Sequence, residues 1–372
     1  MNDATGALGV VGAGTMGAGI AQVALEAGWS VRLLDPLPGA TDRARARIHE
    51  GLRRRVSKHR LTGHDAAAWV DDGVGRLSIA GSVPEVAAGT DLVIEAIVED
   101  LAAKRQLFED LDEAAAPRTI LATNTSALSV TAIAAACRHP GRVVGLHFFN
   151  PAPVLLLVEV VAGSATDPQV LARATDVVSG WGKTAVRSSD SPGFIVNRVN
   201  RPFTIEALRM VERGEAHVAA IDAAVRDAGF PMGPFELMDL VGLDVNLAAA
   251  TGVWDGLGRP ERLRPSPIQA WLVAQGRLGR KASTGFYRYD AGHDPVPMPL
   301  PHDVATPVKE GHALEPTQIV RRIRSAISAE AVLARDEGVA SEADIDTALW
   351  LGAAHPQGPF AWARDHDPTI AG

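Results

Sequence analysis

Apolar positions at the start of the chain follow a strand pattern, then a helix pattern, then a second strand pattern. Leu8 to Val11 is a short apolar run, and Ser30 to Leu34 is a second strand-like segment. Between them, apolar side chains recur at the spacing of one helix face: Ile20, Val23, Ala24 and Ala27. The pattern predicts a strand, a helix over Thr15 to Ala27 that Gly28 ends, and a second strand.

Strand and helix patterns alternate as far as residue 188. Asp91 to Ala96 and Thr119 to Ala122 are typical of buried strands, and a helical pattern begins between them at about Leu101. Farther on, "HFFNPAPVLLLVEVV" runs from His147 to Val161 and predicts two strands around a proline-rich turn. This alternation indicates an α/β domain.

The character of the chain changes near residue 188. "DSPGFIVNRVNRPFTIEALRMVERG" starts with a Pro-Gly turn and continues as a long helix, and helical patterns persist to about Gly279. Alternating prolines then favour extended chain without a core. We predict four segments: an α/β domain (1–188), an all-α domain (189–290), a proline-rich linker (291–316) and a second helical segment (317–372).

The last segment repeats part of the all-α domain. Ile195 to Asp222 resembles Ile319 to Asp346, and "MGPFE" resembles "QGPFA" after one inserted residue. Asn197 of the first copy corresponds to Arg321 of the second. The second copy therefore repeats the scaffold without this polar candidate, and no second glycine triplet precedes it.

Composition narrows the class of protein. The 372 residues are 47% hydrophobic and carry a net charge of −8, which argues against general nucleic-acid binding. Cys137 is the single cysteine, which rules out an internal disulfide and suits a reducing compartment. We see no signal peptide, no apolar run of membrane-helix length and no zinc-like spacing. We expect a cytoplasmic protein with no nucleic-acid, membrane or metal partner.

A glycine triplet connects the first strand to the first helix. Gly12, Gly14 and Gly17 fit G-x-G-x-x-G, and Asp35 follows the second strand. These glycines allow a tight turn, a close approach to a pyrophosphate and close packing of helix on strand. Asp35 can accept hydrogen bonds from an adenosine ribose and would repel a 2′-phosphate, which favours NAD over NADP. We predict an NAD-binding Rossmann domain; the alternative is the same β–α–β unit without a dinucleotide.

One histidine and one glutamate interrupt the apolar run that starts at His147. If the chain reverses about Pro153, His147 and Glu159 become cross-strand neighbours within reach of a hydrogen bond. A histidine oriented by a carboxylate is a common general acid/base unit. The alternative is a satisfied core histidine beside a charged strand end.

Three other polar residues lie where ligands of open α/β sheets bind or where a helix begins. Glu99 and Ser126 each follow the carboxyl end of a predicted strand. Ser126 could instead only cap the next helix. Asn197 stands on a mainly apolar helix start, as either a buried structural hydrogen-bonding group or a substrate ligand.

Cations crowd the helical pattern over residues 41–60, among them Arg54 and Lys58. The usual outcome of such a run is a solvated helix face. In an acidic protein, the local excess also suits a phosphorylated ligand other than the dinucleotide.

Six motifs occur in one order along residues 7–290: "GVVGAGTMGAGIA", "IEAIVEDLAAKRQLF", "NTSALSV", "HFFNPAPVLLLVEVV", "DSPGFIVNRV" and "GFPMGPFELMDLVGLD". Together they resemble the 3-hydroxyacyl-CoA dehydrogenases, of the bacterial 3-hydroxybutyryl-CoA dehydrogenase type. The resemblance implies a Rossmann domain, then an all-α domain like that of 6-phosphogluconate dehydrogenase, and the repeat resembles the duplicated C-terminal domain of longer members. The implied reaction oxidises (S)-3-hydroxyacyl-CoA to 3-oxoacyl-CoA and reduces NAD, in fatty-acid β-oxidation or related acyl-CoA metabolism.

The resemblance also implies roles for the matching residues. His147 becomes the acid/base, Glu159 orients it and stabilises its protonated form, and Ser126 and Asn197 bind the substrate. The positions that match the NAD site are Gly12, Ala13, Gly14, Thr15, Met16, Gly17, Asp35, Glu99, Lys104, Asn150 and Lys281. The positions that match contacts to the CoA substrate are Ser126, Lys58 and Arg54. The context of Lys281, "KASTGFY", lacks the first glycine of the usual Lys-x-Gly-x-Gly-Phe-Tyr pattern.

Two other functions are alternatives for these residues. One is an NAD-dependent dehydrogenase of a non-CoA hydroxy acid, of the gulonate type, and the other is a catalytically silent structural relative similar to a lens crystallin. Members of this family commonly dimerise through the helical domain. Since the second helical copy could take the partner's place, we expect either a monomer or a homodimer of altered geometry.

Overall fold

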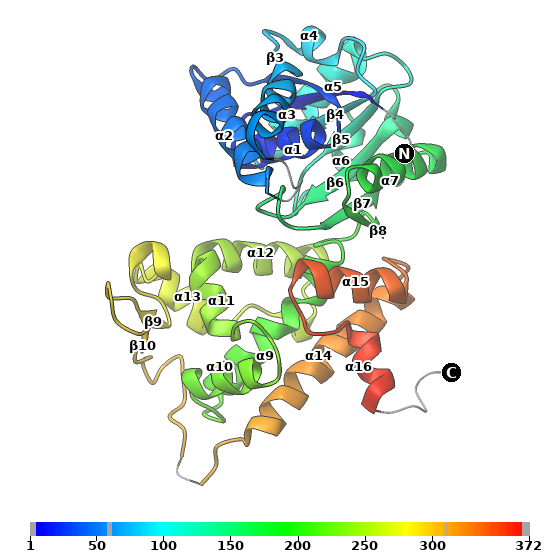
Figure 1. The fold of residues 1–372 in the computed structure, drawn as a ribbon. Coiled ribbons are helices and arrows are strands. Elements are labelled where there is room, and N and C mark those ends of the chain that lie inside the picture. Colours follow the sequence, from blue (N-terminus) through cyan, green and yellow to red (C-terminus); the bar gives the residue numbers. More distant parts are fainter. Residues whose placement is uncertain (1–4, 58–61, 310, 367–372) are drawn as a thin grey trace. The chain divides into compact units, whose positions relative to one another are not determined.

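The computed structural model describes residues 5–57, 62–309 and 311–366, so Lys58 lies outside the described residues. The chain forms two compact units, Met1–Ser191 and Pro192–Gly372 (Figure 1). The second unit includes both helical segments that the sequence pattern had separated into different domains.

One eight-stranded sheet forms the centre of the first unit, with the strand order β3-β2-β1-β4-β5-β6-β7-β8. Its strands are β1 (Ala7–Val11), β2 (Ser30–Leu34), β3 (Leu77–Ile79), β4 (Leu92–Glu95), β5 (Ile120–Thr123), β6 (Val143–Phe148), β7 (Leu157–Ala162) and β8 (Thr184–Ser189). All neighbouring strands are parallel except β6 and β7. Because the strand order reverses between β1 and β4, the carboxyl ends of these strands form the crevice in which doubly wound sheets bind ligands.

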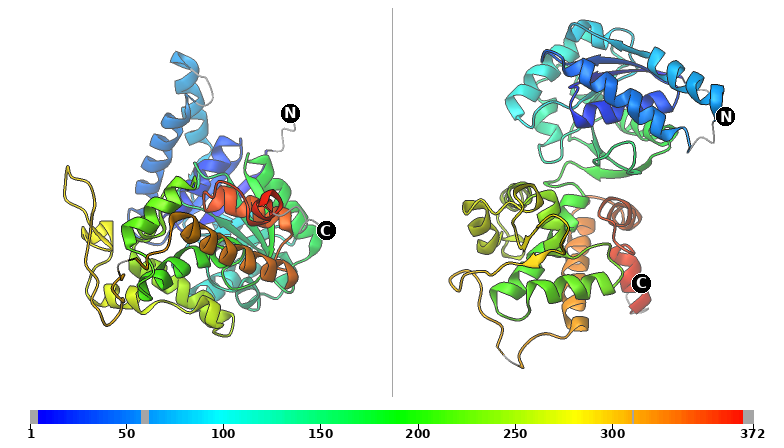
Figure 2. Two further views of the ribbon diagram at one scale, coloured as in Figure 1. Left: turned by 90° about the horizontal axis from the view of Figure 1, so that it is seen from below. Right: turned by 60° about the vertical axis from the view of Figure 1, so that its left-hand side comes forward.

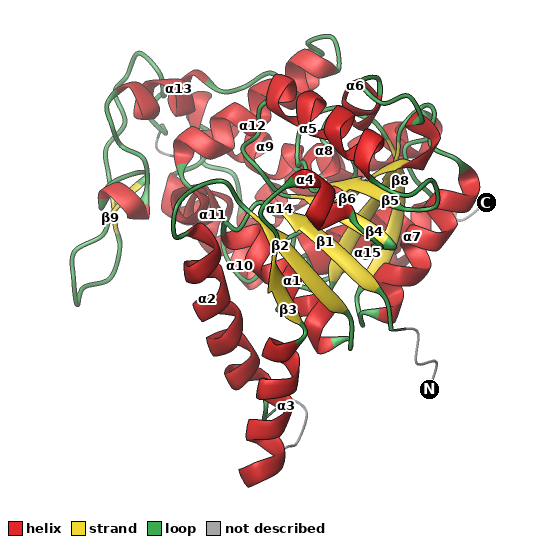
Figure 3. Ribbon diagram, turned by 90° about the horizontal axis from the view of Figure 1, so that it is seen from above, coloured by secondary structure: helices red, strands yellow, loops and turns green. Residues whose placement is uncertain are grey.

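Helices flank this sheet (Figure 3). They are α1 (Thr15–Glu26), α2 (Ala40–Arg55), α3 (Gly63–Gly75), α4 (Val83–Ala87), α5 (Leu101–Ala114), α6 (Val130–Ala134) and α7 (Pro168–Gly180). Every side chain of β4 and β5 is buried, as expected when both faces of a parallel sheet are covered. The pair α2 and α3 projects from the rest of the unit (Figure 2).

The second unit is helical. Its helices are α8 (Val196–Val199), α9 (Arg201–Glu212), α10 (Val218–Asp227), α11 (Pro234–Val241), α12 (Leu243–Gly256), α13 (Pro267–Ala274), α14 (Pro316–Asp336), α15 (Glu342–Gly352) and α16 (Pro359–His366). A short antiparallel ribbon of β9 (Tyr287–Arg288) and β10 (Val296–Pro297) precedes α14. The described part of the proline-rich segment is tied to the helices, since the Thr306 and Leu314 N–H groups donate to carbonyls at the end of α9 and just beyond it.

The prediction of one long helix after Asp190 was wrong in one respect, because the structure has two helices there, α8 and α9, with a break at Asn200. Pro202 has no N–H to donate to the carbonyl of Arg198, so the regular helical ladder cannot pass this point. Ser191 to Ile195 also lie outside the helix, with Phe194 at a φ of +48°.

Equivalent aspartates show that the two helical copies fold alike. Asp222 accepts hydrogen bonds from the N–H groups of Phe235 and Glu236 at the start of α11. Its counterpart Asp346 accepts hydrogen bonds from the N–H groups of Phe360 and Ala361 at the start of α16. The sequence repeat is therefore also a repeat of local structure.

The two copies face each other with reciprocal contacts. Arg198 forms a buried ion pair with Glu330 (2.8 Å), and their counterparts Arg322 and Glu206 pair at 3.1 Å. Residue i of one copy thus meets residue j of the other, and the reverse also holds, as across a two-fold interface. The second unit is internally pseudo-symmetric.

A second reciprocal set lies in the same interface. His355 Nε2 lies 2.8 Å from the Asn200 side-chain oxygen. Their counterparts, Phe230 and Arg324, meet with the guanidinium over the ring at 6.0 Å. The rings of Phe230 and His355 contact each other edge to face.

Within the described residues, no single helix has both the length and the apolar composition needed to cross a membrane. The pair α11 and α12 reaches those criteria when it is counted together across a bend of 103°.

Candidate active site

The glycine-rich loop after β1 fits a dinucleotide phosphate group. Gly12 has a φ of +104°, and a Cβ at Gly17 would lie 1.8 Å from the Gly12 carbonyl oxygen, so the helix and loop approach too closely for a side chain. A Cβ at Gly14 would meet nothing within 4 Å, and both Gly14 and Thr15 are exposed. No side chain caps α1 at Gly14, so its first-turn N–H groups, including that of Met16, face an open surface.

Asp35 follows β2 and supports this loop. One of its carboxylate oxygens accepts a hydrogen bond from the Ala13 N–H (2.7 Å), and the other accepts one from the Leu37 N–H (2.9 Å). A carboxylate oxygen can accept further hydrogen bonds, so the partly exposed group retains acceptor capacity for ribose hydroxyls. The residues present therefore fit NAD.

A buried charge network at the carboxyl end of β4 joins two residues that the resemblance assigns to the NAD site, Lys104 and Glu99, to Glu95, which sequence reasoning missed. Glu95 is completely buried and accepts hydrogen bonds from Lys104 Nζ (2.6 Å) and the Thr123 hydroxyl (2.7 Å). Lys104, itself 1% exposed, also pairs with Glu99 (3.2 Å). A carboxylate within an apolar strand, the signal that identified Glu159, is present at Glu95 as well.

Glu99 holds the turn that follows β5. One of its oxygens accepts hydrogen bonds from the Thr125 hydroxyl (2.5 Å) and from the N–H groups of Ser126 (3.0 Å) and Ala127 (3.3 Å). Burial by itself raises the pKa of Glu99, but the bond from Thr125 and the charge of Lys104 outweigh it, so the net pKa is lowered. The turn is thus fixed by an ionised carboxylate.

Ser126 is exposed on this turn and does not cap the next helix. Ser129 is the N-cap residue of α6, where its hydroxyl accepts a hydrogen bond from the Ala132 N–H. The side-chain oxygen of Asn124, in the same turn, accepts a hydrogen bond from the Phe148 N–H (2.9 Å). The Ser126 turn is therefore attached to the strand that carries His147.

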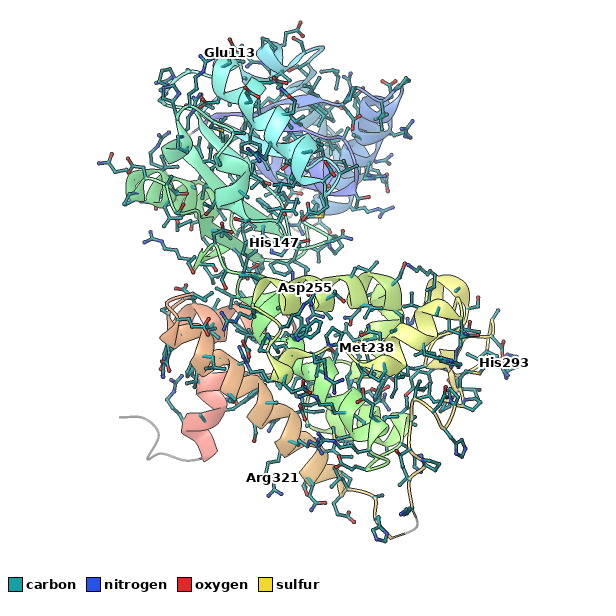
Figure 4. The ribbon with its side chains drawn as sticks, turned by 180° about the vertical axis from the view of Figure 1, so that it is seen from behind. Glu113, His147, Met238, Asp255, His293 and Arg321 are labelled. Atoms are coloured by element: carbon teal, nitrogen blue, oxygen red, sulfur yellow. The ribbon has the colours of Figure 1, made fainter. Side chains whose placement is uncertain are left out.

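His147 and Glu159 form the predicted cross-strand pair. They lie directly opposite each other in the antiparallel ladder of β6 and β7, and His147 Nδ1 lies 2.6 Å from a Glu159 oxygen. His147 is 6% exposed and Glu159 is fully buried. Figure 4 labels His147 near the end of its strand. Since β5 and β6 are parallel, His147 lies at the same edge of the sheet as the Ser126 turn.

The loop after His147 is anchored by a second buried lysine that the sequence did not reveal. Lys183 Nζ donates hydrogen bonds to the carbonyls of Ala152 (2.5 Å) and Leu155 (2.8 Å). Asn150, a predicted NAD-site residue, is exposed at the start of this loop.

Two predicted site residues belong to the second unit. Asn197 lies half-buried in α8. Lys281 lies in a short 3-10 turn and pairs with both carboxylate oxygens of Asp244, at 2.5 and 2.7 Å.

Most arginines of the basic helix α2 are exposed, whereas Arg55 is half-buried and pairs with Glu26 (3.1 Å). The buried side of α2 is apolar and includes Ile48 and Leu52. Arg54 is exposed and pairs with Glu50 (2.9 Å), and Lys58 lies beyond the described part of this segment. Among the described residues, no group of three or more His, Cys, Asp or Glu side chains is placed to hold a metal ion.

Models of one protein family match both units. The model described as "3-hydroxyacyl-CoA dehydrogenase, NAD binding domain" matches residues 7–191. The model described as "3-hydroxyacyl-CoA dehydrogenase, C-terminal domain" matches residues 193–289 and again 319–369. The chain belongs to the 3-hydroxyacyl-CoA dehydrogenase family.

Individual members of this family align over much of the chain. It is 38% identical to the 3-hydroxyadipyl-CoA dehydrogenase of Escherichia coli, over 95% of this chain and 89% of that protein. It is 42% identical to a probable 3-hydroxybutyryl-CoA dehydrogenase of Bacillus subtilis, over 76% of this chain and 96% of the relative. The crystal structure of an E. coli 3-hydroxybutyryl-CoA dehydrogenase superposes with a TM-score of 0.86 at 37% identity, covering 97% and 91% of the two chains.

Membership of the 3-hydroxyacyl-CoA dehydrogenase family confirms the predicted fold class and cofactor. The eight-stranded sheet is of the Rossmann type, and the helical second unit matches the family's C-terminal domain. The cofactor is NAD, and Gly12, Gly14, Gly17 and Asp35 form a surface suited to it.

Proposed function

We propose that His147 and Glu159 are the acid/base unit of an NAD-dependent oxidation of (S)-3-hydroxyacyl-CoA thioesters. The observation that carries this proposal is the 2.6 Å contact between His147 Nδ1 and Glu159 at the ligand-binding edge of the sheet. That contact engages Nδ1, so Nε2 is the nitrogen that exchanges a proton with the substrate. The proposal assigns an acid/base role to a pair whose alternative role is only to satisfy each other's hydrogen bonds in the core.

Each residue has a distinct task in this mechanism. His147 removes the proton from the 3-hydroxyl, and the electrons of the O–H bond form the C3 carbonyl. Bound NAD supplies the acceptor for the hydride that leaves C3. Glu159 holds the ring and stabilises the imidazolium through its negative charge. In the reverse direction, the imidazolium returns the proton to the developing alkoxide.

Positioning falls to two polar groups. Ser126, fixed by Glu99, presents a hydroxyl on the turn after β5 and would hold a substrate oxygen so that C3 meets the cofactor. We assign Asn197 a role in binding the substrate because it lies in the motif "DSPGFIVNRV". The arginines of α2, including Arg54, supply cations for CoA phosphates.

Absorbance of NADH with acetoacetyl-CoA tests the reaction class. We expect rapid oxidation of NADH, with no comparable rate for free acetoacetate or with NADPH. Equal rates with the free acid would favour a non-CoA hydroxy-acid dehydrogenase. A folded protein that binds NADH and turns over neither compound would favour a silent relative.

The acyl chain is a second question. Of two relatives that align over nearly the whole chain, one is named for 3-hydroxyadipyl-CoA and the other for 3-hydroxybutyryl-CoA. Comparing kcat/KM for 3-hydroxybutyryl-CoA and 3-hydroxyadipyl-CoA shows which of these two substrates the protein prefers. A strong preference for 3-hydroxyadipyl-CoA would place a terminal carboxylate among the groups that the protein recognises.

The cytoplasmic location is also a proposal, and it rests on the sequence alone.

A further inference from the structure

A groove in the second unit lies between α10 of the first helical copy and α14 and α16 of the second, and it has no part in the proposed mechanism. It has a volume of about 660 Å³ and opens among α10, α14 and α16. Its lining is mainly apolar and includes Ala224, Pro316, Val320 and Trp362. This size and composition suit a small organic ligand.

The sequence repeat relates residues of this groove to residues of the first helical copy. The groove residues Val320, Arg321 and Arg324 correspond to Val196, Asn197 and Asn200 of the first copy. The α14 wall of the groove is therefore the second copy's equivalent of the α8 face that bears Asn197. Where the first copy has two neutral amides, the second has two guanidinium groups.

Arg324 is a half-buried cation that pairs with no carboxylate in the described part of the chain. Its guanidinium lies over the rings of Trp362 (5.2 Å) and Phe230 (6.0 Å), and one terminal nitrogen donates a hydrogen bond to the Ala228 carbonyl. Its Nε is buried and has no hydrogen-bond acceptor among the described residues. Burial lowers the pKa of Arg324, which shows the cost of holding this charge away from water.

The charges around the groove favour an anion. Arg321 projects from α14 into solvent (Figure 4), and Arg324, three residues farther along the helix, lines the same groove. Asp227 is the acidic residue that lines the groove, and it is exposed. The groove is thus lined by two cations and one solvated carboxylate, and the planar guanidinium of Arg324 can bind a carboxylate through two parallel hydrogen bonds.

We infer that this groove binds an aliphatic carboxylate, with the carboxylate on Arg324 and the hydrocarbon chain along the apolar wall formed by Val320 and Trp362. The site is separate from the proposed catalytic residues, which belong to the first copy and the first unit. It would let the protein sense a fatty acid or a similar carboxylate.

Calorimetric titration of the whole protein with octanoate tests this inference, with octanamide as the uncharged control. We expect saturable binding of octanoate and binding of octanamide about ten- to one-hundred-fold weaker, the factor expected for a charged hydrogen bond. Equal binding of the two compounds, or no saturable binding of octanoate, would overturn the inference.

Variants locate the site. Arg324→Gln should weaken octanoate by a similar factor, whereas Arg213→Gln, an exposed arginine outside the groove, should leave it unchanged. Because Arg324 packs on two rings, its variant is checked by thermal unfolding. Val320→Trp, which fills the groove and keeps Arg324, provides a second test and should also abolish binding.

Two further measurements distinguish binding in this groove from binding at the catalytic residues and from association of two chains. His147→Gln should bind octanoate normally, so failure of the catalytic proposal and failure of this one give different results. If sedimentation shows a dimer that Val320→Trp dissociates, and octanoate does not bind, the groove is an interface between chains and the inference is wrong.

Discussion

The carboxylate of Glu159 is fully buried in β7, where an uncompensated charge would cost several kcal/mol. His147 lies 2.6 Å away and can carry the compensating charge when it is protonated. A pair whose charge balance changes with one proton is suited to passing that proton to and from a substrate.

Replacing His147 with glutamine removes the proton acceptor and keeps a polar side chain. Because general acid/base catalysis contributes about 100- to 10,000-fold, we expect kcat to fall by that factor with NADH affinity unchanged. Stopped-flow turnover and fluorescence titration of NADH measure the two quantities. Wild-type turnover in this variant would remove His147 from the mechanism.

Glu159→Gln keeps a hydrogen-bond acceptor for Nδ1 and removes the negative charge. We expect a loss of kcat of about ten-fold or more, smaller than that for His147→Gln, because the imidazolium loses its stabilising partner. The pH profile of kcat should also change. A profile identical to the wild type would show that the charge of Glu159 is irrelevant to proton transfer.

Selectivity for NAD over NADP should depend on the charge of Asp35. Since Asp35 also accepts the Ala13 N–H, Asp35→Asn is preferable to alanine: its amide oxygen can retain that bond. We expect the ratio of kcat/KM for NAD to that for NADP to fall, because the 2′-phosphate is no longer repelled. An unchanged ratio would mean that other groups exclude NADP.

At the scale of elements, the strand pairing was predictable and the supporting networks were not. The pairing of His147 with Glu159 follows from the two-residue period of strands and one turn position. The hydrogen bonds that Glu99 accepts from the Ser126 turn join the segments after two different strands, and no local period relates these segments. Lys183 reaches the loop after β6 from the start of β8, which is equally invisible in a sequence pattern.

The break between α8 and α9 shows a different reason for a missed feature. Apolar spacing continues smoothly through Asn200, so periodicity predicts one helix. The missing N–H of Pro202 decides the geometry, because one absent donor interrupts the ladder regardless of side-chain pattern.

His355, between α15 and α16, couples the packing of the helical copies to pH. Burial and the nearby charge of Arg324 lower its pKa to about 3, below the usual value of about 6.5. The folded protein therefore resists a proton that the unfolded chain accepts. The unfavourable effect of His355 on the free energy of unfolding is absent above about pH 6.5. Below that pH it lowers the free energy of unfolding progressively as the pH falls towards 3.

We expect the wild type to lose up to about 1.4 kcal/mol of unfolding free energy per pH unit in that window through His355 alone. His355→Gln, which can keep the hydrogen bond to Asn200, should lose less on acidification because glutamine takes up no proton. Urea unfolding at pH 7 and pH 5 measures both proteins, and the difference between their slopes isolates this group from the carboxylates. Parallel slopes would show that His355 does not resist protonation.

At the scale of the whole molecule, one chain contains both halves of a pseudo-symmetric helical unit. The ion pairs of Arg198 with Glu330 and of Arg322 with Glu206 join the two copies, and the same contacts made between two chains would form an isologous dimer interface. Because the copies cover each other, the face of α9 against α14 is unavailable to a second chain.

We therefore propose that the protein is a monomer, and that the second copy takes the place of a partner. Sedimentation equilibrium of the full chain should give the mass of one chain over a wide range of concentrations. The midpoint of thermal unfolding should also be independent of concentration, since folding that requires association becomes more favourable as concentration rises. A dimer whose unfolding midpoint rises with concentration would mean that another surface joins two chains, and that the internal repeat stabilises each chain without replacing a partner.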